Sequence, residues 1–141
     1  MQRTTLAWAS ALLMIGVAMG AFGAHGLKEL LPSYAIAQWN TAVLYQFIHA
    51  LGLLALAAMA DRLPPKGARW VRLFFLLGIL CFSGSLYLLS TRTMLGLQDL
   101  TPVLGPITPL GGLFFICGWL VLLIVALRPV EVRSSQAVGK P

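Results

Sequence analysis

The sequence predicts an all-α integral membrane protein, a four-helix bundle with both termini on the cytoplasmic side. Three observations lead to this prediction: the chain is strongly apolar, it holds four apolar stretches of membrane-spanning length, and its basic residues gather on one side of them. Of its 141 residues, 59% are hydrophobic and only 10% are charged, and the mean hydropathy is +0.87. These values lie outside the range of soluble globular domains.

Each of the four stretches approaches the ~20 apolar residues that a helix needs to cross a hydrocarbon core of ~30 Å. The predicted spans are residues 6–24, 41–60, 71–89 and 110–127. Because they use more than half of the chain, residues 1–130 are predicted to form a single membrane domain. Residues 131–141 are predicted to be a short disordered cytoplasmic tail.

The basic residues predict the orientation. Of the 10 Lys and Arg residues, eight fall on the side of the N-terminus, the second loop and the C-terminus, and two fall on the other side. The positive-inside rule therefore places both termini in the cytoplasm of a multi-pass protein, which we expect in a bacterial inner membrane. The first group is Arg3, Arg62, Lys66, Arg69, Arg72, Arg128, Arg133 and Lys140, and the second is Lys28 and Arg92.

The formal net charge of +6 is explained by attraction to the lipid bilayer and does not indicate nucleic acid binding. The basic residues sit at span ends and in a short loop, and they form no basic stripe on a soluble face.

The first span carries Gly16, Gly20 and Gly23 on one face, a pattern that lets helix backbones approach closely in lipid. The first 24 residues also have the outline of a secretory signal. We expect an uncleaved helix, because the apolar run is longer than a usual signal core. After the span, leucines alternate with Lys28 and Glu29 up to Pro32, which predicts a short interfacial amphipathic helix.

The second span has the highest polar content of the four. Thr41, Tyr45 and His49 are four residues apart, so they share one helix face with Gly52. His49 lies about nine residues from the outer end at Asn40, which places it roughly 13 Å deep.

The third span carries Ser83, Gly84 and Ser85 in its second half. The connection that follows, residues 90–109, is apolar but rich in Gly and Pro, and it is predicted to fold back onto the outer membrane surface. Pro109 is expected to start the fourth helix.

His49 is the ionisable residue that the sequence places deep within a span, and such a residue is a functional candidate by default. Three alternatives remain open for it: a neutral hydrogen-bonding strut, a proton relay or ligand contact, and a haem or metal ligand. Haem ligation by His25 and His49 is disfavoured because His25 sits at the outer boundary. Cys81 and Cys117 lack metal-site spacing and are expected to behave as small hydrophobic residues.

Catalysis is not expected. The acidic residues are Glu29, Asp61, Asp99 and Glu131, all in loops or in the tail. A cluster of His25, Glu29 and Asp99 on the outer side is conceivable, but loop charges are usually solvated. We therefore expect no enzyme activity, no cofactor and no metal.

Six short segments form a pattern that recurs in one family: 20–27 (GAFGAHGL), 39–46 (WNTAVLYQ), 49–52 (HALG), 82–87 (FSGSLY), 105–112 (GPITPLGG) and 118–119 (GW). Through them the chain resembles domain-of-unknown-function family 423, which holds small membrane proteins related to YgdD and transmembrane protein 256. The resemblance covers roughly residues 6–127 and implies a four-helix membrane protein with no established activity. It carries over no catalytic residue.

Two sets of residues follow as candidates. The polar ones, for a ligand site or a polar network, are His49, Tyr45, Gln46, His25, Ser83, Ser85 and Thr108. The helix-packing ones are Gly16, Gly20, Gly23, Gly52, Gly84, Gly111 and Gly112.

The leading functional hypothesis is a non-catalytic subunit, assembly factor or scaffold that binds other membrane proteins or itself. A small transporter, channel or lipophilic-ligand-binding protein that uses the His49 and Tyr45 face is the alternative, followed by a haem or quinone subunit.

Overall fold

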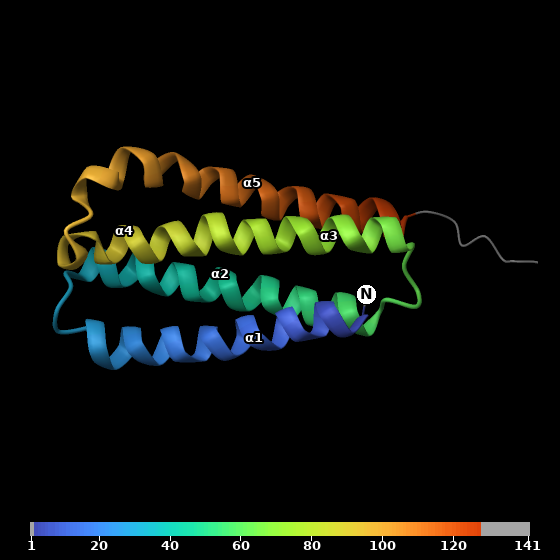
Figure 1. Ribbon diagram of the computed structural model, residues 1–141, viewed down its shortest axis with the longest axis horizontal. Coiled ribbons are helices and arrows are strands. Elements are labelled where there is room, and N and C mark those ends of the chain that lie inside the picture. Colours follow the sequence, from blue (N-terminus) through green and yellow to red (C-terminus); the bar gives the residue numbers. More distant parts are fainter. Residues whose placement is uncertain (1, 128–141) are drawn as a thin grey trace, which may run out of the picture.

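The computed structural model describes residues 2–127, and this part of the chain folds into long antiparallel helices without strands (Figure 1). Four helical rods of 26, 26, 31 and 29 residues are long and apolar enough to cross a membrane. This confirms the all-α four-span prediction. The predicted tail at residues 131–141 lies outside the described residues.

Three of the four rods change helix type along their length. The first rod is α1 (Gln2–Ala21), which continues as a π-helical segment, η1 (Phe22–Leu27). The second is α2 (Ser33–Ala58). The third joins α3 (Pro65–Gly78), the π-helical η2 (Ile79–Ser83) and α4 (Gly84–Leu95). A short 3₁₀ turn, η3 (Gln98–Leu100), leads into α5 (Thr101–Ala126).

The rods are arranged with two inner and two outer members (Figure 1). α1 packs on α2, α5 packs on the α3–η2–α4 rod, and these two inner rods pack on each other. Within the most apolar stretch of each rod, 17% of the residues are buried in the first and fourth rods, against 33% in the second and 44% in the third. The outer rods therefore present most of their surface to lipid.

The apolar core has two parts. The larger part lies among α1, α2, α3, η2 and α5, and the smaller part lies around the first loop. The larger cluster is Ala9, Leu53, Leu56, Ala68, Val71, Phe75, Ile79 and Phe115, and the smaller one is Leu27, Leu31, Ala35 and Trp39.

Glycines allow the inner rods and α5 to pack closely around phenylalanine rings. A Cβ on Gly118 would lie 2.6 Å from Phe75 Cε1, and one on Gly52 would lie 2.8 Å from Phe75 Cε2. Gly78 lies directly against Phe115 in the same way. Close packing of this kind drives helix association in lipid, where burying apolar surface provides little driving force.

The first loop differs from the sequence prediction. In place of the short interfacial helix predicted there, residues 28–31 form a turn. Leu27 and Leu31 are buried against Trp39 and Ala35 instead of lying on the membrane surface, while Leu30 is 63% exposed. α2 then starts at Ser33, eight residues before the predicted span, because Ala35 and Trp39 give its first turns a buried face.

The third connection also differs, because most of it is helical rather than folded back as an irregular segment. Gly96 ends α4 with a left-handed backbone (φ 66°), as expected at a helix C-terminus. α5 already starts at Thr101, and Pro106 and Pro109 lie inside it. Prolines are tolerated inside membrane helices when neighbouring groups satisfy the freed backbone atoms.

Candidate functional site

His49 lies in the second half of α2 and is surrounded by aromatic rings from α3 and α5. Its ring is 3% exposed. It stacks face to face on Phe115, with ring centroids 3.4 Å apart and an angle of 8°. The Phe75 ring lies edge-on to it with centroids 5.3 Å apart, and the Trp119 ring lies tilted at 6.0 Å. The imidazole is therefore enclosed by side chains that exclude water.

Both ring nitrogens of His49 have hydrogen-bond partners. Nδ1 lies 2.8 Å from the Tyr45 carbonyl oxygen, and Trp119 Nε1 lies 3.1 Å from Nε2. An indole N–H can only donate, so Nε2 must be the unprotonated acceptor. Nδ1 then carries the hydrogen and donates it to Tyr45. The hydrogen bonds thus select one neutral tautomer, because an imidazolium would set its own N–H against that of Trp119.

Gln46 makes a second polar connection, between three rods. It is 2% exposed, its Nε2 donates to the Leu12 carbonyl at 2.8 Å, and its Oε1 accepts from the Tyr87 hydroxyl at 2.9 Å. α1, α2 and α4 are thereby joined through one side chain.

Two serines of the third rod make further connections, one to α2 and one to α5. Ser83, fully buried in η2, donates to the Ala42 carbonyl on α2 at 2.9 Å. Ser85 on α4 lies 2.7 Å from the Thr108 hydroxyl on α5. Thr108 Oγ1 also lies 3.4 Å from the Leu104 carbonyl, in the stretch of α5 that contains the two inner prolines.

The other two predicted polar residues have different surroundings. Tyr45 is 36% exposed, stacks on Phe82 at 4.5 Å, and contributes to the network through its backbone carbonyl. His25 is exposed in η1, before the first loop. The structure therefore brings His49, Gln46, Ser83, Ser85 and Thr108 into buried or half-buried contacts between helices, and it leaves His25 apart from them.

Sequence reasoning missed three polar aromatic side chains. Trp119 and Tyr87 donate to His49 and Gln46, and Trp39 Nε1 donates to the Met19 carbonyl at 2.9 Å. A buried Trp or Tyr usually finds a hydrogen-bond partner, and this rule was the available signal. It does not identify the partner, which for Trp119 lies 70 residues away.

The predicted packing glycines fall into two groups. Most face a residue of a neighbouring rod: Gly16 faces Phe47, Gly20 faces Val43, Gly23 faces Trp39, Gly52 faces Phe75, Gly112 faces the Phe82 ring, and Gly111 faces the Phe82 backbone. A Cβ on Gly84 would instead meet only the Ile79 carbonyl of its own rod, at 4.0 Å. Gly67, Gly78 and Gly118, which were not among the candidates, make equally close approaches.

Within residues 2–127 no group of three His, Cys, Asp or Glu side chains is placed to hold a metal ion. Four surface cavities of the described part are lined by residues other than His49, Gln46 and Ser83. Nε2 of His49 already accepts the Trp119 N–H, so the ring would have to break this bond to act as a ligand or a proton carrier.

Comparisons with known proteins agree on one family. The family model "Protein of unknown function (DUF423)" matches residues 19–112. The UPF0382 membrane protein YwdK of Bacillus subtilis is 42% identical over 119 residues, which cover 82% of this chain and 89% of the relative. A UPF0382 membrane protein of Haemophilus influenzae is 42% identical over 106 residues, covering 75% and 79%.

The Escherichia coli relative, the UPF0382 inner membrane protein YgdD, is 35% identical over 114 residues, covering 81% of this chain and 82% of the relative. No solved structure matches. The four apolar rods, the motifs around His49 and the coverage of these relatives lead to one conclusion: the chain belongs to the DUF423 family of uncharacterised membrane proteins.

Proposed function

We propose that this protein is a non-catalytic component of membrane protein assemblies, which acts as a subunit, assembly factor or scaffold for other membrane proteins. The main supporting observation is that the deepest polar groups bond across helices to one another. His49 binds Trp119, Gln46 binds Tyr87 and Leu12, and Ser83 binds Ala42. A polar interior that is satisfied in this way stiffens the bundle.

The two outer rods differ in the side chains that they expose to the membrane. α1 exposes Ser10, Ala18 and Ala21 among larger residues, whereas α5 exposes a row of large aliphatic side chains, such as Leu113, Ile116 and Leu120. Membrane helix interfaces are enriched in small residues. The outer face of α1 is therefore the surface on which we expect a partner helix, and the outer face of α5 is expected to contact lipid.

Site-specific crosslinking of the full chain in native membranes tests this function. A photo-crosslinking residue at Ala18 is expected to capture a discrete membrane protein or a second copy, which also co-purifies in a mild detergent. The same residue at Leu120 is the matched control and is expected to give only lipid adducts. The proposal fails if neither crosslinking nor gentle extraction recovers a partner or an oligomer.

The alternative functions make other predictions for the same preparation. A transporter or ligand-binding protein needs an open path to His49 and Tyr45, and a haem or quinone subunit needs a free ring nitrogen or a bound chromophore. Bound quinone, a Soret band, or substrate binding that is lost in a folded His49→Gln variant would replace our proposal.

We also propose that both termini are cytoplasmic. The count of basic residues on the two sides supports this orientation, and Arg3, Arg62, Lys66, Arg69 and Arg72 belong to the described part of the basic side. Single cysteines at Lys66 and Lys28 in a Cys81→Ser, Cys117→Ser background test it. A membrane-impermeant thiol reagent is expected to label position 28 in intact cells and position 66 only after permeabilisation, and the reverse pattern would contradict the orientation.

A further inference from the structure

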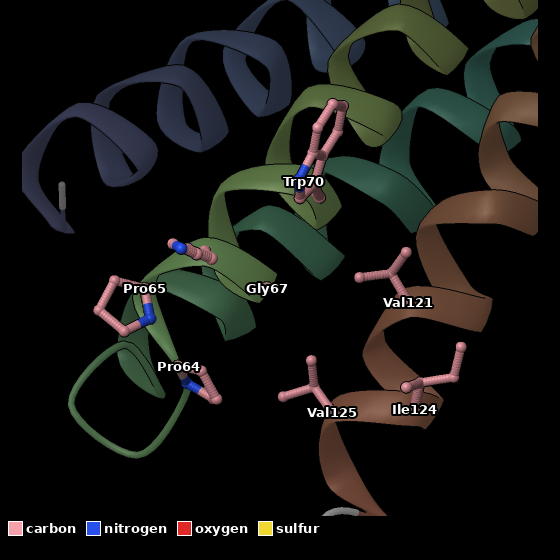
Figure 2. Close-up of a pocket in the computed structure, with 8 residues that line it drawn as sticks. Pro64, Pro65, Gly67, Trp70, Val121, Ile124 and Val125 are labelled. Atoms are coloured by element: carbon pink, nitrogen blue, oxygen red, sulfur yellow. The ribbon is translucent and has the colours of Figure 1, made fainter.

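A groove of about 640 Å³ lies between the beginning of α3 and the end of α5 (Figure 2). Its volume is within the ~300–1,000 Å³ range of small-ligand sites. Val121 and Val125 on α5 point across the groove toward the first turns of α3 (Figure 2). The groove is lined by Pro64, Pro65, Lys66, Trp70, Ile124 and Val125, among others.

The groove is apolar along its walls and basic at its mouth. Arg62, Lys66 and Arg69 follow one another in the loop and the first turn of α3, all three exposed, and Lys66 lines the groove itself. Lys66 and Arg69 are three residues apart, so they lie on neighbouring positions of the helix surface. The described acidic residue of this loop, Asp61, accepts a hydrogen bond from Gln2 at 2.8 Å and so contacts α1 rather than the groove.

The order of these surfaces along the membrane normal matches the order of groups in a phospholipid. Trp70, 54% exposed and part of the groove wall, is the kind of side chain that resides at the level of lipid headgroups. Val121 of α5 lies across from Trp70, and Val125 lies across from Gly67 and Pro64, nearer the loop (Figure 2). Lys66 lines the loop end of the groove. An acyl chain would lie in the surface groove along the α3–α5 contact, where Val125 packs on Gly67, with its phosphate beside Lys66 and Arg69.

We propose that this groove binds one anionic phospholipid, with an acyl chain along the α3–α5 contact and the headgroup held by Lys66 and Arg69. Charge complementarity selects this occupant over two others. A second copy related by a two-fold axis would bring two Lys66–Arg69 pairs together, and like charges repel. The C-terminal residues 128–141 carry Arg128, Arg133 and Lys140 against Glu131, so they are also net positive.

Tryptophan quenching by brominated lipids tests the proposal on the full chain reconstituted in phosphatidylcholine vesicles. The Trp70 signal is the difference between the wild-type chain and Trp70→Phe. A small amount of brominated phosphatidylglycerol is expected to quench this signal more strongly than the same amount of brominated phosphatidylcholine. Each basic side chain near the membrane surface attracts anionic lipid. Removing one should therefore lower the preference for phosphatidylglycerol over phosphatidylcholine about fivefold. Lys66→Gln with Arg69→Gln should therefore abolish it.

Arg3→Gln is the matched control, because it removes one positive charge from the same end of the bundle without touching the groove. It is expected to leave the Trp70 preference unchanged. The proposal is overturned if the wild-type chain shows no preference, if the double variant keeps it, or if Arg3→Gln lowers it as much as Lys66→Gln. Two further outcomes would also overturn the proposal. Weak quenching by both lipids that rises when the protein is diluted would assign the groove to a second copy. Weak quenching that rises when residues 128–141 are removed would assign it to the C-terminal segment.

Discussion

The two histidines of this chain lie in opposite surroundings. His49 is 3% exposed, stacks on Phe115, and has a partner at each ring nitrogen. His25 is exposed in η1, beside the first loop. In the structure a neutral imidazole with two hydrogen-bond partners joins α2 to α5, so we propose that this ionisable residue deep in a membrane span acts as a structural link between helices.

The two histidines should differ most in how much each contributes to the stability of the fold. His49→Ala removes a stacked ring and two hydrogen bonds and leaves a cavity, and it should lower the free energy of unfolding by about 4 kcal/mol. His25→Ala should change it by less than about 0.5 kcal/mol, as surface substitutions usually do. Unfolding in mixed micelles by titration with a denaturing detergent measures both. Similar values for the two variants would refute the structural role of His49.

The close packing of α5 against η2 in the bundle interior can be tested without changing any polar group. A Cβ on Gly111 would collide with the backbone nitrogen of Phe82, which cannot move aside cheaply. Gly111→Ala should therefore cost about 2 to 3 kcal/mol.

Gly105 is the control for Gly111, because it lies in the same helix and has nothing within 4 Å of its would-be Cβ. Gly105→Ala should gain about 0.5 to 1 kcal/mol, since alanine is the better helix former. A loss of equal size in both variants, measured in the same detergent titration, would contradict the packing.

The sequence predicted the spans well, because the bilayer thickness imposes a length that apolar stretches must match. The helices start before the predicted spans, by the widest margin in α2 and α5. The first turns of α2 expose polar side chains such as Ser33 and Tyr34, so they resemble a loop, while their buried residues, Ala35 and Trp39, are few. Pro106 and Pro109 suggested a break, but membrane helices accommodate proline.

The polar network was only half predictable, for a different reason. The four-residue spacing of Tyr45 and His49 is a local signal that any helix obeys. The partners of the network are not local: Trp119 is 70 residues from His49, and Tyr87 is 41 from Gln46. Which helix faces meet depends on the packing of glycines against phenylalanines across the bundle, and no single segment encodes this.

Gln46 provides a test of intermediate size. Gln46→Ala removes both of its bonds and leaves the Leu12 carbonyl and the Tyr87 hydroxyl without that partner, which should cost about 2 kcal/mol. A double-mutant cycle that combines Gln46→Ala with Tyr87→Phe should give a coupling energy of about 0.6 kcal/mol, as is typical of hydrogen bonds between membrane helices.

Thr41→Ala is the control for Gln46. The Thr41 hydroxyl bonds within its own helix, to the Ala37 carbonyl, and the side chain is exposed, so the change should be close to zero. A Gln46–Tyr87 coupling that is indistinguishable from zero would remove Gln46 from the network.

The smallest expected energetic effect gives the sharpest test of the His49 assignment. Trp119→Phe keeps an aromatic ring but removes the N–H donor, and it should cost about 1 kcal/mol. Its main consequence is spectroscopic. Nitrogen NMR of labelled histidine should show His49 in the wild-type chain as a neutral ring with the hydrogen on Nδ1, because the indole requires Nε2 to accept. Without Trp119 the Tyr45 carbonyl still requires a donor at Nδ1, so the hydrogen should stay on Nδ1 while the Nε2 signal moves toward that of a nitrogen that accepts no hydrogen bond. Trp70→Phe, on the surface of α3, should leave the His49 signals unchanged.

A protonated Nε2 in the wild-type chain would mean that the Trp119 bond does not form. His49 would then have a free nitrogen, and the functional alternatives would regain their candidate.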